Sequence, residues 1–267
     1  MKVRLLDFGT ITADIGWAID AGGVSTHSNQ SPDTLRRDFQ ILGALIEHPK
    51  HGVILYDIGP APNWKDLWPD PVKEVFAITR HEEENRLDKQ LEKAGYTLKD
   101  VSCIIISHLH LDHAGGLECF RGIDVPVYAH EEEIKYAFYA IATKQDFGAY
   151  LPYYIDPAFN WKAVHGEEFE IFEGITLYQT QGHTPGTMSM KVALNGSESF
   201  LFTTDTMLFK ENYYDEQPLG WLIRDVSEWW RSLAKLKSIA TRYNSHVILG
   251  HDEEVFAEYT KKSFYGS

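Results

Sequence analysis

Short apolar runs alternate along this chain with stretches in which apolar residues recur at helical spacing. The short runs end in polar or turn-forming residues and predict strands. They lie at residues 53–56, 101–106, 175–180, 199–203 and 246–249. Helices are predicted at 85–94, 131–142 and 227–243. Strands and helices that alternate in this way predict an α/β fold, with sheets covered by helices.

The chain has no linker rich in Gly, Ser or Pro and no internal repeat, so we expect one domain over residues 1–267. The formal net charge of -14 argues against a nucleic-acid partner. No apolar stretch approaches the about 20 residues that span a bilayer, and the N-terminus lacks a secretory signal pattern. We therefore expect a cytoplasmic protein without a membrane partner, with Cys103 and Cys119 as reduced thiols.

Histidines and aspartates cluster in the loops that follow four of the predicted strands. Ligands bind at strand ends in α/β proteins because the strands aim their terminal loops at one crevice. The residues concerned are His108, His110, Asp112 and His113 after the second predicted strand, His183 after the third, Asp205 after the fourth and His251 after the fifth. The sequence therefore predicts one site built from four loops.

The spacing within residues 108–113 predicts two metal ions rather than one. Three imidazoles and a carboxylate within six residues cannot all reach one ion without strain, whereas a turn can send His108 and His110 to one ion and Asp112 with His113 to another. Nitrogen and carboxylate ligands without thiolate suit Zn²⁺, with Mn, Fe or Co as alternatives. Asp205 could bridge both ions. Two divalent ions, two carboxylates and one hydroxide leave a net charge of about +1, which favours hydrolysis by a metal-bridging hydroxide.

The sequence of residues 108–116, His-Leu-His-Leu-Asp-His-Ala-Gly-Gly, resembles the signature of the metallo-β-lactamase superfamily. Over nearly its whole length the chain is similar to one branch, the N-acyl-homoserine lactonases. Residues 182–186 (Gly-His-Thr-Pro-Gly), 210–213 and 250–252 carry this second resemblance. It implies an αβ/βα sandwich of two mixed sheets flanked by helices, and a substrate that is an N-acyl homoserine lactone or a similar small lactone.

The resemblance also implies a role for each residue of the predicted site. His108, His110 and His183 would bind the first ion, Asp112, His113 and His251 the second, and Asp205 would bridge the two. Asp112 would also pass a proton to the departing ring oxygen, which makes Asp112 and Asp205 the catalytic candidates. Asp252 is either part of a solvated acidic turn or a carboxylate that orients His251.

One position departs from the lactonase pattern. Lactonases of this branch usually carry a Tyr three residues after the bridging Asp, but this chain has Leu208 there. Losing one oxyanion donor costs about 100-fold in rate unless another group replaces it. Tyr213 is one candidate replacement, and Leu111, Leu208 and Tyr150 are further candidates for substrate contact. The aromatic-rich stretch 128–161 either packs in the core or forms an apolar wall over the metals, and residues 22–37 could form a second wall.

Other functions share this predicted site. One alternative is a different cyclic ester, such as a pyridoxolactone-like or aryl lactone. A glyoxalase II-type thioesterase would use the same metals, but such enzymes carry a helical region after the last ligand, and here only residues 252–267 follow His251. Outside enzymes, a metal-containing protein that binds a small ligand remains an alternative. Relatives of the lactonase branch occur as monomers and dimers, so a homodimer is a further expectation.

Overall fold

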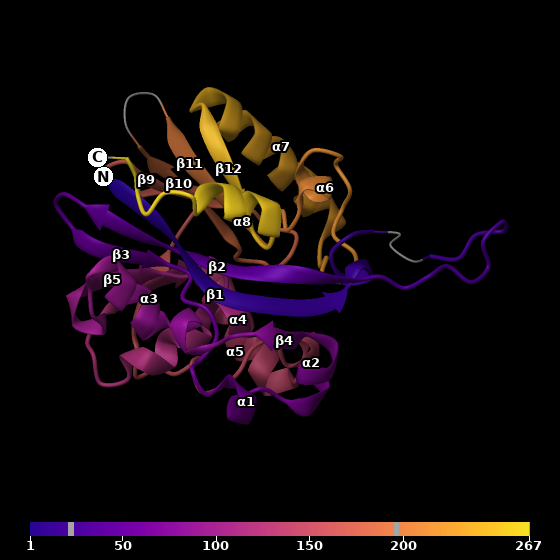
Figure 1. The fold of residues 1–267 in the computed structure, drawn as a ribbon, viewed down its shortest axis with the longest axis horizontal. Helices are drawn as coiled ribbons and strands as arrows, with labels where there is room; N and C mark the ends of the chain where they lie inside the picture. Colours follow the sequence, from indigo (N-terminus) through magenta and orange to yellow (C-terminus); the bar gives the residue numbers. More distant parts are fainter. Residues whose placement is uncertain (21–23, 195–197, 267) are drawn as a thin grey trace.

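Two mixed β-sheets face each other in the computed structural model, which describes residues 1–20, 24–194 and 198–266 (Figure 1). The first sheet has the order β13-β1-β2-β3-β5-β6-β7, with β4 paired to β1. Its strands are β1 (Lys2–Asp14), β2 (Arg36–His48), β3 (Gly52–Tyr56), β4 (Ala77–Arg80), β5 (Val101–Ile105), β6 (Pro126–His130), β7 (Asn160–Val164) and β13 (Tyr265–Gly266). The second sheet has the order β12-β11-β10-β9-β8. Its strands are β8 (Glu168–Phe172), β9 (Ile175–Gln179), β10 (Met188–Ala193), β11 (Ser199–Thr204) and β12 (Ser245–Leu249).

Helices cover the outer faces of both sheets. Figure 1 shows α1 to α5 beside the first sheet, and α6 to α8 beside the second. Their bounds are α1 (Trp64–Leu67), α2 (Asp70–Val75), α3 (Leu87–Ala94), α4 (Leu111–Ala114), α5 (Glu131–Thr143), α6 (Lys210–Tyr213), α7 (Val226–Arg242) and α8 (Glu253–Tyr259). This is the predicted αβ/βα sandwich, and the buried apolar side chains of both layers form one continuous core.

The predicted strands and helices are confirmed, with small shifts at their ends. The helix predicted from residue 85 begins at Leu87, because Arg86 is extended and residues 83–85 form a separate 3₁₀ turn. Gly95 ends this helix with a φ of 87°, a left-handed conformation that glycine adopts without steric cost. The helix at 227–243 is α7, which begins one residue earlier behind the capping carboxylate of Asp225.

The long hairpin of β1 and β2 was not predicted from the sequence. Both strands are buried over most of their length, so they lack the simple alternation of a half-exposed strand. A bulge between Asp7 and Gly9 also interrupts the pattern of β1. Gly9 has a φ of 104°, and a Cβ atom there would lie 1.9 Å from the carbonyl oxygen of Arg80. Glycine is therefore required where the end of β4 lies against β1, its antiparallel neighbour in the sheet.

Parallel strand pairs bring the loops of the predicted site to one edge of the sandwich. In the first sheet β3 runs parallel to β5, and Tyr56 pairs with Ile105. In the second sheet β11 runs parallel to β12, and Thr204 pairs with Leu249. The residues that follow these pairs therefore leave their sheets side by side.

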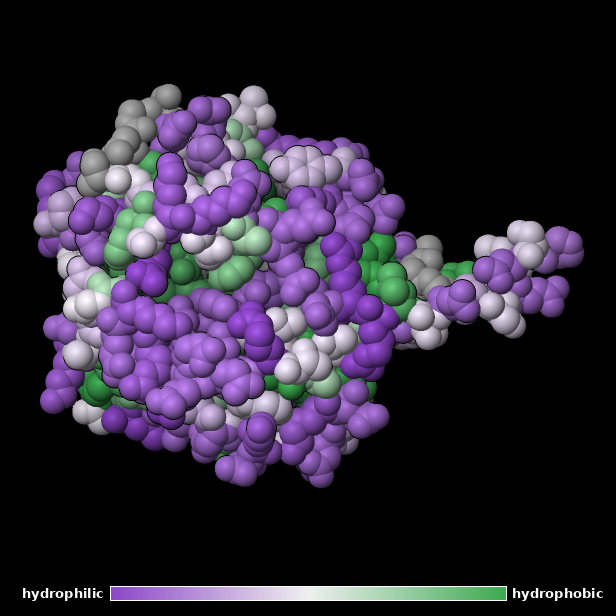
Figure 2. Space-filling view, viewed as in Figure 1, coloured by the Kyte–Doolittle hydropathy of each residue, from purple (hydrophilic) through white to green (hydrophobic). Residues whose placement is uncertain are grey.

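The segment between β1 and β2 leaves the body of the molecule. Residues 24–35 contain no helix or strand and extend away from the sheets in Figure 1. The second wall expected at 22–37 includes residues 22 and 23, which lie outside the described residues. Figure 2 shows a mostly hydrophilic face, as the net charge of -14 leads one to expect. In the described part of the chain, no helix has the length and apolar character needed to cross a bilayer.

Candidate metal centre

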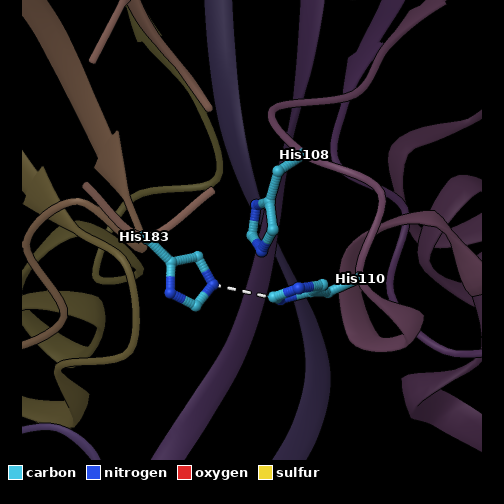
Figure 3. A group of neighbouring side chains, drawn as sticks. All are labelled: His108, His110 and His183. Carbon is cyan, nitrogen blue, oxygen red and sulfur yellow. Dashed lines mark hydrogen bonds between the residues drawn. The ribbon is translucent and has the colours of Figure 1, made fainter. Parts of the chain in front are cut away.

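Five histidines and two aspartates meet between the two sheets, as the sequence predicted. All five imidazoles and Asp205 are buried, and the Asp112 side chain is 14% exposed. Three groups of potential ligand atoms each lie within 4.8 Å of one another. They are His108, His110 and His183; His108, His113 and Asp205; and Asp112, His113 and His251. Figure 3 shows the first group, with the rings converging from the loops after β5 and β9.

Asp205 lies between the two sets of imidazoles, with one oxygen toward each. Its Oδ2 is 3.4 Å from Nε2 of His183 and 3.8 Å from Nε2 of His108. Its Oδ1 is 3.1 Å from Nε2 of His251 and 3.2 Å from Nε2 of His113. A carboxylate in this position can bind two cations at once, one through each oxygen.

The second set is completed by Asp112, which enters from the first turn of α4. Its Oδ2 lies 3.6 Å from Nε2 of His113 and 3.8 Å from Nε2 of His251. The short helix begins directly after His110, so that Asp112 and His113 follow each other on one turn. The loop therefore contributes His108 and His110 to one group of potential ligand atoms and Asp112 with His113 to another, while His108 and His113 also share a group with Asp205.

Hydrogen bonds on the outer nitrogens orient three of the rings. Nδ1 of His183 donates to the carbonyl of Leu222 at 3.0 Å, and Nδ1 of His251 donates to the carbonyl of Gln40 at 2.9 Å. Nδ1 of His113 lies 2.9 Å from the Asp57 carboxylate. A neutral imidazole that donates from Nδ1 has a lone pair on Nε2. In their neutral form these rings therefore present lone pairs toward the centre of the cluster.

Several inner atoms of the cluster lack partners within the protein, although Nε2 of His183 lies within hydrogen-bond distance of Nδ1 of His110, at 3.0 Å (Figure 3). Nε2 of His108, Nε2 of His113 and Oδ1 of Asp205 are buried and make no hydrogen bond among the described residues. Leaving buried polar atoms unpaired is costly, so natural structures rarely retain several of them together. A donor set of imidazole nitrogens and carboxylate oxygens that converge in this way fits divalent metal ions.

The charges inside the cluster are strongly coupled. Burial works to lower the pKa of His113, but the carboxylates of Asp205, Asp112 and Asp57 outweigh it and raise that pKa well above its usual value. Burial and the neighbouring His113 hold the pKa of His108 well below its usual value. Burial opposes ionisation of Asp205, yet His251, His113 and His108 lower its pKa well below 3.8. The carboxylates therefore stabilise positive charge on His113, whereas burial keeps His108 in its neutral form.

Asp57 is a functional residue that the sequence analysis missed. It follows β3 with a φ of 49° and accepts hydrogen bonds from the backbone N–H and the hydroxyl of Ser107, at 2.8 and 2.7 Å. The same carboxylate holds His113. A buried carboxylate that orients a ligand imidazole is typical of the outer layer of metal sites. Its signal in the sequence is an aspartate directly after the strand predicted at 53–56.

Neither interpretation of Asp252 was right: the residue is 1% exposed, so it is not part of a solvated turn, and His251 donates to Gln40 instead. The Asp252 carboxylate accepts from the backbone N–H of Val255 at 3.0 Å and caps the N-terminus of α8. The carbonyl of Gln40, on β2, takes the place of the expected carboxylate at His251. This contact joins the two sheets, and nothing in the local sequence around His251 indicates it.

Glu133 joins the two loops that carry the first group of histidines. Its buried carboxylate accepts from the N–H groups of Leu109 and Gly186, at 2.8 and 3.2 Å, and from the hydroxyls of Thr184 and Tyr150, at 2.5 and 2.9 Å. Burial raises the pKa of Glu133, while these four donors lower it. Gly186 is required here, because a Cβ atom would lie 2.2 Å from the backbone nitrogen of Glu133.

An apolar cavity of about 680 Å³, open to solvent, leads to the cluster. Trp17, Phe39 and Phe76 give it aromatic walls, and His110, Asp112, His183, Asp205 and His251 form its polar end. Leu111 and Leu208, two of the expected substrate contacts, also line it. A mostly apolar lining with a few convergent polar groups is typical of a site for a small, largely apolar molecule.

The other two expected substrate contacts lie elsewhere. Tyr150 packs its ring on His110, with centroids 4.7 Å apart, and gives its hydroxyl to Glu133. Tyr213 lies beside Tyr214 and Lys237. Neither is among the described residues that line the cavity. The other aromatic residues of 128–161 whose side chains are described do not line the cavity either. The side chain of Phe147 lies outside the described part of the chain.

Comparisons with known proteins agree with this geometry. The sequence model of the metallo-beta-lactamase superfamily matches residues 36–251. The chain belongs to this superfamily. An N-acyl homoserine lactonase from Bacillus sp is 32% identical over 244 residues, which cover 88% of this chain and 92% of the relative. The N-acyl homoserine lactonase AiiB of Agrobacterium fabrum is 26% identical over 272 residues, covering 98% and 97%.

A solved structure of a similar protein contains a ligand at its metal centre. It is an N-acyl homoserine lactone hydrolase with the product N-hexanoyl-L-homoserine bound at its catalytic metal centre. It superposes with a TM-score of 0.78 at 26% identity, and the match covers 96% of this chain and 95% of that one. The similarity therefore includes both sheets and all four loops of the cluster.

We predict that Glu133→Gln lowers the free energy of unfolding by about 1–3 kcal/mol, because the amide nitrogen cannot accept the bonds that one carboxylate oxygen now accepts. Chemical denaturation measures this change. The control is Glu132→Gln on the same helix, whose side chain is 45% exposed and pairs only with Lys135. Equal stability of the two variants would show that Glu133 does not hold the loops together.

Proposed function

We propose that this enzyme opens the ring of a lactone, with N-acyl homoserine lactones as the preferred class. One observation carries the proposal: the metal-ligand cluster lies at the end of an apolar cavity in a chain that is 32% identical to an N-acyl homoserine lactonase. In this proposal residues 1–267 act as a single hydrolase domain.

We propose that His108, His110 and His183 bind one Zn²⁺ ion and that Asp112, His113 and His251 bind a second, with Asp205 shared between them. The unpartnered inner atoms and the two-sided position of Asp205 support this assignment. Bound there, the ions would acidify a water molecule to supply the nucleophile and would polarise the carbonyl of the lactone. The outer hydrogen bonds from Asp57, Gln40 and Leu222 would keep the rings in place during the reaction.

The chain's own residues divide the remaining tasks. The walls of the cavity, including Leu111 and Leu208, would exclude water from the lactone and its acyl chain. Asp112 is the carboxylate of the cluster with the larger exposed fraction, 14% against 7% for Asp205, and it lines the cavity. We therefore assign it the transfer of a proton to the departing ring oxygen.

Leu208 carries no oxyanion donor, and neither Tyr213 nor Tyr150 reaches the cavity to replace one. Neither position 208 nor these tyrosines would then donate a hydrogen bond to the lactone carbonyl, so charge stabilisation of the tetrahedral intermediate would be a contribution of the bound ions. In this proposal the metal centre would contribute more of the rate enhancement than it does in lactonases that retain a tyrosine at this position.

The proposal is tested by proton release from zinc- or cobalt-loaded protein on a substrate panel. The panel contains N-acyl homoserine lactones of short and long chain, simple γ- and δ-lactones, an aryl lactone and a glutathione thioester. We expect the acylated homoserine lactones to be opened fastest. Turnover of the thioester with no lactone opened would contradict the proposal and favour a glyoxalase II-type thioesterase. Metal binding without turnover of any compound would favour a ligand-binding protein.

Asp112→Asn should lower kcat at least about 100-fold, because an amide keeps the size of the side chain but cannot carry the proton. Steady-state kinetics on the best lactone measures the effect, and metal content is determined on the same sample. The matched control is Asp124→Asn, an exposed aspartate that binds Asn160 outside the cavity. Near-normal kcat with both metals retained would remove Asp112 from the proton-transfer role.

A further inference from the structure

Two charged residues that belong to no metal-ligand group line the cavity. Among its described lining residues, only Asp146 and Arg224 are charged and lie outside the cluster. They come from distant parts of the chain: Asp146 follows α5, and Arg224 precedes α7. Nε of Arg224 donates to Oδ1 of Asp146 at 2.7 Å. An ion pair in an otherwise apolar wall needs a reason, because desolvating two charges is costly.

Asp146 lies beside the guanidinium of Arg224 and near the hydroxyl of Tyr136, whose pKa burial and Asp146 raise to about 12. The side chain of Asp146 is 8% exposed, and its Oδ2 makes no hydrogen bond among the described residues. Its backbone has a φ of 55°, a left-handed conformation that aspartate adopts more readily than most residues other than glycine. A buried oxygen without a hydrogen-bond partner on a residue that lines a cavity is an acceptor open to a ligand.

Arg224 is anchored beside the first group of histidines. Its backbone N–H donates to the carbonyl of Gly182 at 2.7 Å, directly before His183. Two residues earlier, the Leu222 carbonyl accepts from Nδ1 of His183. Within the protein, the guanidinium donates from Nε to Asp146 and from Nη1 to carbonyls of residues 221 and 223. Its side chain is 34% exposed and faces the same cavity.

The chemistry of this pair selects among possible ligand groups. The two charges cancel, so the pair has no net attraction for an anion. A purely apolar group would leave Oδ2 of Asp146 buried and unpaired. A neutral group with a donor and an acceptor side by side satisfies both residues: its N–H reaches Oδ2, and its carbonyl accepts from the guanidinium. A secondary amide has this arrangement.

We propose that Asp146 and Arg224 are specificity-determining residues that bind a secondary amide of the substrate. The inference rests on the proposed lactonase function. In an N-acylated amino lactone the amide is attached to the carbon next to the ring carbonyl, so a residue that binds it must share the cavity of the metal-ligand cluster. Asp146 and Arg224 meet this requirement. The pair then separates N-acylated amino lactones from simple lactones of equal length.

The test compares two substrates on each variant. One is an N-acyl homoserine lactone, and the other is a γ-lactone of equal length in which methylenes replace the amide. In Asp146→Asn the remaining oxygen stays with Arg224, so the NH₂ group faces the N–H of the substrate. Arg224→Met removes the donor. For both variants we expect the ratio of kcat/KM, amide lactone to amide-free lactone, to fall about 10- to 100-fold.

Matched controls use a second, exposed ion pair. Arg121 binds Asp156 at 3.1 Å outside the cavity, so Arg121→Met and Asp156→Asn should leave the ratio unchanged. Thermal melting confirms that each variant is folded. An unchanged ratio in both cavity variants would overturn the inference. An equal loss on both substrates would also overturn it, because that result is expected of a pair that only fastens residues 144–149 to residues 221–225.

Binding of a lactam analogue separates this inference from the proposed function. The analogue keeps the amide and replaces the ring oxygen with N–H, so it resists ring opening, and calorimetry measures its affinity for the metal-loaded protein. We expect the affinity to fall about 10- to 100-fold in Asp146→Asn and Arg224→Met. Failure of the wild-type protein to bind the analogue would overturn the inference. Binding that depends on the pair without opening of any lactone would sustain the inference and reject the lactonase proposal.

Discussion

Five imidazoles and two carboxylates are held in a space from which water is largely excluded, and several of their inner atoms find no partner in the described protein. This arrangement is unfavourable for a protein alone, because buried polar atoms without hydrogen bonds cost free energy. Divalent cations held there would reverse the balance by supplying partners for these atoms. We regard this dependence on bound charge as the constraint around which the fold is organised.

The fold meets the constraint by fastening each loop from outside the cluster. Parallel pairs of strands deliver the loops to one edge, and hydrogen bonds from Asp57, Glu133 and the Gln40 carbonyl then fix their side chains or backbone. Several of these contacts join segments far apart in the chain. The Gln40 carbonyl lies on β2 of the first sheet and holds His251, which follows β12 of the second. Orientation of the rings thus depends on the packing of the two sheets and not on any one loop.

The sequence predicted the residues that meet in the cluster better than the residues that hold them. The spacing within residues 108–113 predicts that these residues separate into two groups of potential metal ligands. Short apolar runs predict the strands that precede the ligand loops. Asp57, Glu133, Asp146 and Arg224 have no such local pattern, because their partners are distant in sequence. Asp252 is a similar case: the sequence left open a solvated acidic turn or a partner of His251, but the residue is buried and its carboxylate caps α8. The aromatic walls come from Trp17, Phe39 and Phe76 rather than from the aromatic-rich stretch 128–161.

The most direct test of the metal centre is a crystal structure of zinc-loaded protein with anomalous data collected on both sides of the zinc edge. The account predicts two anomalous peaks per chain. One should contact His108, His110 and His183, the other Asp112, His113 and His251, and Asp205 should lie between them. A single peak, or peaks that leave Nε2 of His108 and His113 without a ligand bond, would contradict the account.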